Sequence, residues 1–288
     1  MEFRGDIMKK YPFVLFIIAL IASQQSVADI TLKFGIYTSD KPTTMVTTFR
    51  PILNTLEQKL TTKLGEPVTI SMQVSKNYVD GINNLVNADV DFARMGPASY
   101  IISKDSNPDL QLLVMENKKG SKTFYGVICV HQDSDITNIS QLKNHSFAFG
   151  NENSTIGRYL SQLMLSEHGV TSSHLSKYEY LHRHDRVGTA VGSGNYDAGA
   201  LKESTFKKLQ DKGVKIKELA RFPNVTKPWI ASHRLDARVV EALQTSLLEI
   251  DSEEELKKLK KQGFFLAKDS DYDRIREAIE KNNQFFQT

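Results

Sequence analysis

The chain has few of the residues that mark several protein classes. A single cysteine, Cys129, among 288 residues rules out an intramolecular disulfide and excludes Cys-rich zinc or iron–sulfur sites. The 37 basic and 34 acidic residues leave a net charge of only +3, far from the basic excess of a dedicated nucleic-acid surface. Hydrophobic residues make up 40% and charged residues 25%, close to the globular average. Disorder, collagen and coiled coil are therefore excluded, and we expect a globular protein that does not bind nucleic acid.

Only one long apolar run occurs, and it lies at the N-terminus. Lys9 and Lys10 precede the run 11–21, and Ser26-Val-Ala28 places small residues before Asp29. This is the order of a secretory signal peptide. The alternative is an uncleaved anchor, but the run is shorter than the roughly 20 apolar residues that span a membrane. We predict that residues 1–28 are a signal peptide cleaved near Ala28 and that the protein works in the periplasm.

The rest of the chain alternates strand patterns with helical patterns. Strands are predicted at Ile30–Tyr37, Val68–Val74, Val90–Met95, Phe124–Val130, Ser146–Gly150, Ala198–Leu201 and Trp229–Ser232. Helices are predicted at Thr44–Leu64, Tyr78–Asn87, Thr155–His168, His184–Ser193, Asp236–Ile250 and Asp271–Phe286. Pro51 would lie in the first turns of its helix or mark a kink. This alternation predicts an α/β fold with parallel sheets.

The segment after the predicted strand 146–150 has the features of an anion site. A helix start offers unpaired backbone N–H groups and the positive end of its dipole. The hydroxyl groups of Ser154 and Thr155 can add donors to the same anion. The alternative is plain helix capping, which the residues alone favour.

Several segments together resemble a known family. In chain order they are Phe49–Leu60, Tyr78 at a helix start, Val90–Tyr100, Phe147–Gly157, Asn195–Leu201 and Phe222–Trp229. These resemble the phosphate/phosphite/phosphonate-binding family of periplasmic solute-binding proteins, the receptors of ABC importers. Gly96-Pro-x-Ser-Tyr100 and Ser154-Thr-x-Gly157 are fairly specific as a pair, and the resemblance covers nearly the whole chain after residue 28.

The resemblance implies a type II periplasmic-binding-protein fold, with two α/β lobes joined by a two-strand hinge. Lobe 1 would comprise residues 29–118 plus 226–288, and lobe 2 residues 119–225, with the hinge near Met115–Tyr125 and Leu219–Trp229. The implied function is capture of a small oxyanion (phosphonate, phosphite or phosphate-like) for an ABC permease. The alternatives are presentation of the anion to a membrane histidine kinase and, less favoured, an exported enzyme.

The resemblance also implies a set of ligand-binding residues. Lobe 2 would contribute Ser154, Thr155, Ile156, Gly157 and His184. Lobe 1 would contribute Ser99 and Tyr100, whose alternative is a core tyrosine, and the strand-end residues Tyr37, Thr38 and Ser39. His182-x-His184 could be read as a metal pair, but no third ligand lies in sequence reach, so we predict no metal site.

Four charged residues bear on the identity of the ligand. Members of the family that bind aminoalkylphosphonates hold the amine with acidic residues, and Glu203 could be one of them. Lys227 stands where the family often has an acid, and Lys202 and Arg94 are further cations that the pattern does not call for. An ammonium in place of a carboxylate would repel an amine and favour a more anionic ligand.

Motifs of catalysis are absent from the sequence. It contains no H-E-x-x-H, G-x-S-x-G, P-loop or dinucleotide fingerprint. Cys129 lies inside the apolar run 125–130, where it reads as a small buried hydrophobe. We predict a binding protein without enzymatic activity or cofactor.

Overall fold

The computed structural model describes residues 29–38, 43–251 and 253–287. The predicted signal peptide, residues 1–28, and the candidate Ser39 lie outside the described residues. Within the described ranges, no helix is both long enough and apolar enough to cross a membrane.

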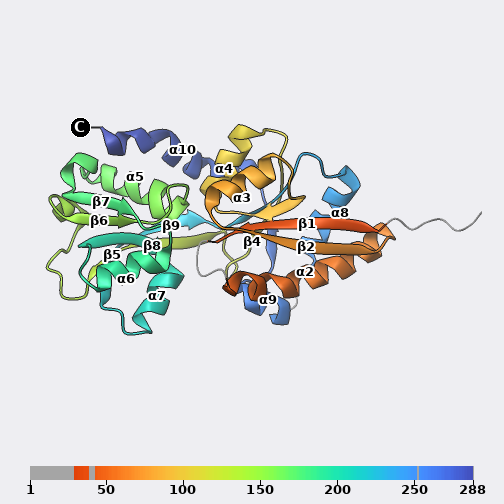
Figure 1. Ribbon diagram of the computed structural model, residues 1–288, viewed down its shortest axis with the longest axis horizontal. Coiled ribbons are helices and arrows are strands. Elements are labelled where there is room, and N and C mark those ends of the chain that lie inside the picture. The colour runs from red at the N-terminus through yellow and green to blue at the C-terminus, as the bar shows by residue number, and fades with distance from the viewer. Residues whose placement is uncertain (1–28, 39–42, 252, 288) are drawn as a thin grey trace, which may run out of the picture.

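The described strands form two separate sheets, which define two lobes (Figure 1). The first sheet has the order β11-β4-β10-β3-β1-β2. Its strands are β1 (Ile30–Tyr37), β2 (Val68–Ser75), β3 (Phe92–Arg94), β4 (Gln111–Glu116), β10 (Pro228–Ala231) and β11 (Phe264–Leu266). The second sheet has the order β7-β6-β8-β5-β9. Its strands are β5 (Thr123–His131), β6 (Ser146–Phe149), β7 (Lys177–Tyr180), β8 (Ala198–Lys202) and β9 (Ile216–Val225).

Helices cover both faces of each sheet. In the first lobe, α2 (Thr43–Leu64), α8 (Ala237–Leu248) and α9 (Glu253–Leu259) bury their apolar faces on one side, and α3 (Tyr78–Val86) and α4 (Pro97–Ser106) on the other. In the second lobe, α6 (His184–Gly192) and α7 (Glu203–Gln210) lie on one face and α5 (Leu160–Glu167) on the other. The predicted α/β class is confirmed, since each sheet lies between helical layers.

The expectation of parallel sheets is wrong for the strands nearest the hinge and for β11, which is antiparallel to β4. The pairs β1–β2, β1–β3, β6–β7 and β6–β8 are parallel, but β10 is antiparallel to β3 and β4, and β5 is antiparallel to β8 and β9. The reason is the path of the chain between the lobes. It leaves the first lobe after β4 and returns after β9, so the outgoing and returning strands run in opposite directions.

The two crossings run side by side. Residues 117–122 lead from β4 to β5, and residues 226–227 lead from β9 to β10. Backbone bonds tie them together, because Thr226 N donates to Lys122 O at 2.8 Å and Glu116 N donates to Lys227 O at 3.1 Å. These bonds continue the ladder across the hinge and hold its two strands in register.

The C-terminal segment also connects the lobes. It comprises α10 (Asp273–Glu280) and the 3₁₀ turn η5 (Lys281–Phe286), and Figure 1 shows it passing over both lobes. Phe285 packs against Phe149 of the second sheet, with ring centroids 5.5 Å apart. Arg158 of the second lobe donates to Asn282 Oδ1 at 2.8 Å. The end of the stretch 226–288, which is predicted to belong to lobe 1, thus contacts lobe 2, where the Phe285 side chain is buried.

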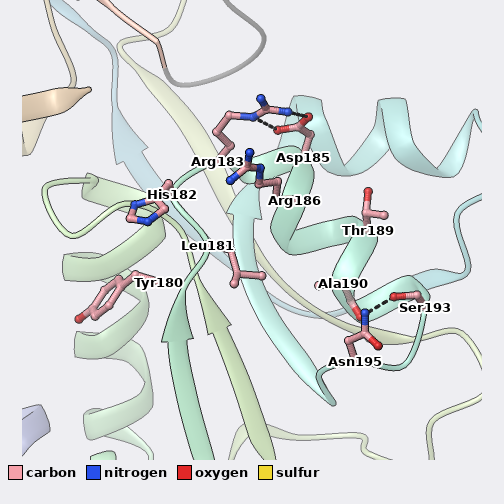
Figure 2. A pocket seen from close by; sticks show the side chains of 10 residues that line it. All are labelled: Tyr180, Leu181, His182, Arg183, Asp185, Arg186, Thr189, Ala190, Ser193 and Asn195. Carbon is pink, nitrogen blue, oxygen red and sulfur yellow. Dashed lines mark hydrogen bonds and ion pairs between the residues drawn. The ribbon is translucent and has the colours of Figure 1, made fainter. Parts of the chain in front are cut away.

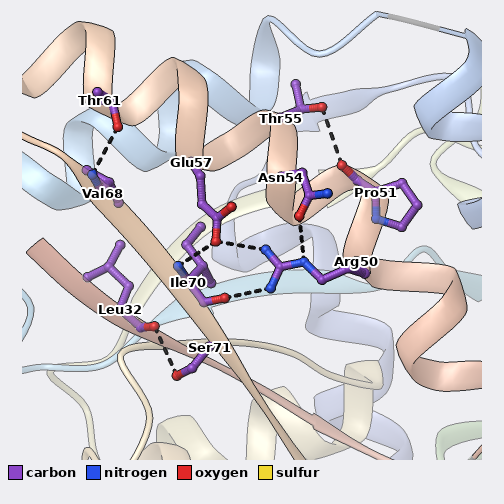
Figure 3. Close-up of polar contacts among 10 residues, drawn as sticks. All are labelled: Leu32, Arg50, Pro51, Asn54, Thr55, Glu57, Thr61, Val68, Ile70 and Ser71. Atoms are coloured by element: carbon purple, nitrogen blue, oxygen red, sulfur yellow. Dashed lines mark hydrogen bonds and ion pairs between the residues drawn. The ribbon is translucent and has the colours of Figure 1, made fainter.

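Helix α2 protects the open edge of the first sheet (Figure 3). Strand β2 is the edge strand, and the backbone of its residue Ile70 is capped by two side chains of α2. Glu57 Oε1 accepts from Ile70 N at 2.7 Å, and Arg50 donates to Ile70 O at 2.8 Å. Satisfied edge groups cannot pair with another chain. Pro51 lies inside this helix and not in its first turns.

A buried ion cluster lies at the end of β4, next to the hinge. The Glu116 carboxylate is fully buried, with Arg94 Nε 2.7 Å from Oε1 and Lys261 Nζ 2.7 Å from Oε2. Burial alone would raise the pKa of Glu116, but the charges of Arg94 and Lys261 outweigh it and lower that pKa to about 2. The cluster joins β3, β4 and the loop that precedes β11.

This cluster predicts an acid-sensitive contribution to stability. Because the pKa of Glu116 falls from 4.5 to about 2 on folding, its contribution is present above pH 4.5 and is lost as the pH drops toward 2. Such a difference corresponds to roughly 3 kcal/mol. In denaturant unfolding at a series of pH values, Glu116→Gln should lower the unfolding free energy at neutral pH by about 3–5 kcal/mol. It should also flatten the dependence between pH 4.5 and 2.

The matched control is Glu277→Gln, which removes an exposed ion pair with Lys281. It should change the acid dependence much less than Glu116→Gln does, because solvent screens this exposed pair. A Glu116→Gln variant with an unchanged slope would contradict the assigned role.

Candidate functional site

A small cavity lies between the lobes, beside the hinge. Its volume is about 20 Å³, room for about one water-sized sphere, so the lobes are closed against each other. The described residues that line it are Tyr78, Gly96 and Pro97 from the first lobe, Phe124, Ser154, Thr155, Ile156, His184, Lys202 and Asn224 from the second, and Lys227 from the returning crossing.

Five helices begin at this cavity. Tyr78 opens α3, Gly96 and Pro97 start α4, and His184 opens α6. Lys202 precedes α7, and Ser154 precedes the π-helical turn η2 (Thr155–Tyr159) that continues into α5. Each of these helices follows a strand, and parallel strands place their carboxyl ends on one edge of a sheet. The cavity therefore receives the unpaired N–H groups and positive dipole ends of helices from both lobes.

The Ser154–Gly157 segment is shaped by a close backbone contact. Gly150 N donates to Gly157 O at 2.8 Å, and a Cβ added to Gly157 would lie 2.7 Å from Gly150 Cα. Only glycine at both positions lets the loop after β6 fold back onto the helix start. Ser154 Oγ accepts from Gly157 N at 3.0 Å, so this hydroxyl caps the turn as well as lining the cavity. In this geometry the Ser154 hydroxyl can cap the turn and also donate a hydrogen bond into the cavity.

Thr155 makes the direct contact between the lobes. Its Oγ1 accepts a hydrogen bond of 2.8 Å from the backbone N–H of Ala98, in the first turn of α4. Both groups are buried. An anion placed between the two helix starts would compete for the same N–H group.

Tyr37 and Ser99 lie behind the first-lobe residues that line the cavity and hold them in place. Tyr37 Oη accepts from Gly96 N at 2.6 Å and lies 2.8 Å from Ser99 Oγ, and burial raises the pKa of this phenol. Its ring packs on that of Tyr78, with centroids 4.1 Å apart. Neither Tyr37 nor Ser99 is among the described residues that line the cavity; they fix Gly96 and Tyr78, which are. Thr38 instead donates to Lys76 O at 2.8 Å, away from the cavity.

Tyr100 is predicted to donate to the ligand, but in the structure its hydroxyl group has another partner. Its hydroxyl donates to Asp269 Oδ1 at 2.6 Å, and its ring packs edge-on against Tyr272. Burial and the Asp269 carboxylate raise the pKa of Tyr100. The side chain lies one helical turn beyond the cavity-lining start of α4, so it points toward the C-terminal segment. The core alternative describes this residue.

The four charged candidates divide into two pairs. Lys202 and Lys227 both line the cavity. Arg94 is instead engaged by Glu116. Glu203 accepts from Lys207 at 2.9 Å and lies 3.0 Å from Arg221, and it is not among the described lining residues. The expectation that Glu203 contacts the ligand is not supported, because its carboxylate faces the cations of α7 and β9.

The two histidines of His182-x-His184 face different surroundings. His184 lines the cavity, whereas His182 lines a surface groove of about 510 Å³ on the second lobe. Figure 2 shows this groove, where the Arg183 guanidinium is paired with Asp185 at 2.6 Å. Among the described residues, no group of three or more His, Cys, Asp or Glu side chains could hold a metal ion. Cys129 is fully buried, and burial raises the pKa of its thiol to about 12.

Asn224 is the functional candidate that sequence reasoning missed. It is 3% exposed, and neither Oδ1 nor Nδ2 has a hydrogen-bond partner among the described residues. A buried polar group left in this state costs about 1–3 kcal/mol. Four further lining residues were not predicted as site residues, namely Tyr78, Gly96, Pro97 and Phe124. The helix-start members could have been found by examining the end of every predicted strand, whereas Asn224 gives no comparable signal.

The position of Tyr100 generates a prediction. Tyr100→Phe removes the hydrogen bond to Asp269 and should lower the unfolding free energy by roughly 1–3 kcal/mol. The affinity for ligand should change less than about twofold, because the hydroxyl does not face the cavity. Thermal unfolding and calorimetric titration measure the two effects separately, with the exposed Tyr125→Phe as control. A large loss of affinity at unchanged stability would restore the original prediction.

Comparison with known proteins places the chain among transport proteins. The family model described as "ABC transporter, phosphonate, periplasmic substrate-binding protein" matches residues 34–272. A relative from Prochlorococcus marinus (strain MIT 9301), called a probable ABC transporter phosphite binding protein, PhnD1, is 26% identical over 230 residues, 72% of this chain and 77% of the relative.

Solved structures share the fold. PhnD1 of Prochlorococcus marinus in complex with methylphosphonate has a TM-score of 0.74 at 24% identity, covering 88% of this chain and 98% of that one. A binding-protein component of an ABC phosphonate transporter from Pseudomonas aeruginosa has a TM-score of 0.76 at 16% identity, covering 89% of this chain and 87% of that one. These likenesses confirm the expected type II periplasmic-binding-protein fold. Because the family model matches more than half of the chain, the chain belongs to the phosphonate-binding family of periplasmic substrate-binding proteins of ABC transporters.

Proposed function

We propose that this protein captures a small phosphorus oxyanion, either phosphonate, phosphite or phosphate-like, in the periplasm and delivers it to the permease of an ABC importer. The anion lies between the lobes and contacts Ser154, Thr155, His184, Lys202 and Lys227. The protein binds its ligand and performs no chemistry on it. Because the family consists of ABC-transporter components, delivery to a permease is favoured over presentation to a histidine kinase.

The observation that carries the proposal is the convergence of helix starts from both lobes on one cavity. Each helix N-terminus stabilises an adjacent negative charge by about 0.3–1 kcal/mol, and more when the site is partly buried. The charged side chains among the described lining residues include Lys202 and Lys227, which add to the same positive field. A tetrahedral anion with several acceptor oxygens can use donors from both lobes at once, so its binding favours the closed arrangement.

The ligand class is tested on the exported protein. Calorimetric titration with methylphosphonate, phosphite, phosphate and sulfate should show binding of at least one phosphorus oxyanion. At 100 times its dissociation constant, that ligand should stabilise the fold by about 2.7 kcal/mol in thermal unfolding. Failure of every phosphorus oxyanion to bind would overturn the proposed function.

The Ser154-Thr155 element is tested by the double variant Ser154→Ala/Thr155→Ala. Each charge-assisted hydrogen bond lost should weaken binding of the phosphorus oxyanion by roughly 1.5–3 kcal/mol. The fold should survive, since loss of a cap costs only about 1 kcal/mol. Thr171→Ala removes a capping threonine remote from the cavity and serves as the matched control. Equal affinities of the double variant and the control would restrict Ser154 and Thr155 to capping.

A further inference from the structure

Asn224 lines the ligand cavity with an amide group whose oxygen and nitrogen are both buried. It lies in β9 opposite Phe124, another lining residue, and side chains of paired residues project from the same face of a sheet. Phe222, two residues earlier and so on the same face, packs beside Ile156 over Gly126. Asn224 is 97% buried by this arrangement, and no side chain or backbone group of the described residues pairs with Oδ1 or Nδ2.

The amide oxygen Oδ1 only accepts hydrogen bonds, whereas the hydroxyl groups of Ser154 and Thr155 in the same cavity can also donate. The helix starts and the two lysines supply donors, which any oxyanion can use. A fully deprotonated anion only accepts hydrogen bonds and would leave Oδ1 facing another lone pair. An anion that still carries one proton can donate its O–H to Oδ1 while an adjacent oxygen accepts from Nδ2. The amide thus matches a P(=O)–OH edge at two points.

We propose that Asn224 is a specificity-determining residue that recognises the singly protonated form of a phosphorus oxyanion and rejects sulfate and sulfonates. This inference rests on the proposed function and names the property of the ligand that the site selects. Phosphate monoesters have a second pKa of about 6, so a singly protonated species is available near neutral pH. A sulfonate of the same shape has no proton to donate. A site built to bind a hydroxyl strongly rejects an analogue that lacks it, because its own polar group then stays unpaired.

The test uses two ligands of equal shape, methylphosphonate and methanesulfonate, in calorimetric titrations of the exported protein. The unmodified protein should prefer methylphosphonate by at least about 100-fold. Asn224→Leu keeps the approximate volume and removes both polar atoms, and it should reduce this preference to less than about tenfold. A residue that only packs would weaken both ligands equally and leave the ratio unchanged.

Two further variants complete the design. Asn224→Asp retains an acceptor of the same size and should keep a ratio no lower than that of the unmodified protein, even where the added charge weakens both ligands. Asn83→Leu makes the same substitution on the exposed surface of α3 and should change neither affinity. Binding of methylphosphonate with an unchanged ratio in Asn224→Leu, or a collapsed ratio in Asn224→Asp, overturns the inference alone. No binding of any phosphorus oxyanion by the unmodified protein overturns the proposed function itself.

Discussion

The site depends on one constraint, the placement of helix starts by parallel strands. Two strands of the first lobe, β2 and β3, and three of the second, β6, β7 and β8, end on the edge that faces the other lobe. In each case the next helix begins within a few residues. The backbone N–H groups therefore attract the anion, and side-chain donors add further hydrogen bonds. Ser154 shows how the two levels combine, because its hydroxyl caps η2 and lines the cavity at the same time.

Contacts at the hinge hold the two lobes in register. The hinge strands are tied by the bonds of Thr226 and Glu116 to the opposite crossing, and the buried cluster around Glu116 anchors them in the first lobe. The C-terminal segment adds a third connection. On one side, Arg276 of α10 pairs with Asp269, which accepts a hydrogen bond from Tyr100 of the first lobe. On the other side, Asn282 accepts from Arg158 of the second lobe. Since Arg158 belongs to η2, the turn that begins at the cavity is also attached to the segment that spans the lobes.

The sequence predicted what local patterns determine. The strand at Ile30–Tyr37 was predicted with its observed bounds, and the helix starts at Tyr78 and His184 were placed correctly. Local patterns do not predict side-chain orientations that depend on contacts distant in sequence. The orientation of Tyr100 depends on Asp269, 169 residues away, and that of Glu203 on Arg221 of a different element. Asn224 escaped prediction for a related reason, since an asparagine within a strand has no periodic signal and its meaning emerges only from the cavity wall around it.

The hydrogen bond between Ala98 N and Thr155 links affinity to conformation. In the closed arrangement this bond already joins the lobes, and the cavity beside it holds only about 20 Å³. A tetrahedral anion must therefore replace this hydrogen bond, and its own bonds to the two helix starts then hold the lobes in the closed arrangement. A ligand shifts the balance between open and closed forms only by the difference between these interactions. An anion that contacts both lobes makes additional bonds in the closed form and so favours it. An anion held by one lobe alone makes no bond that compensates for loss of the Ala98–Thr155 hydrogen bond.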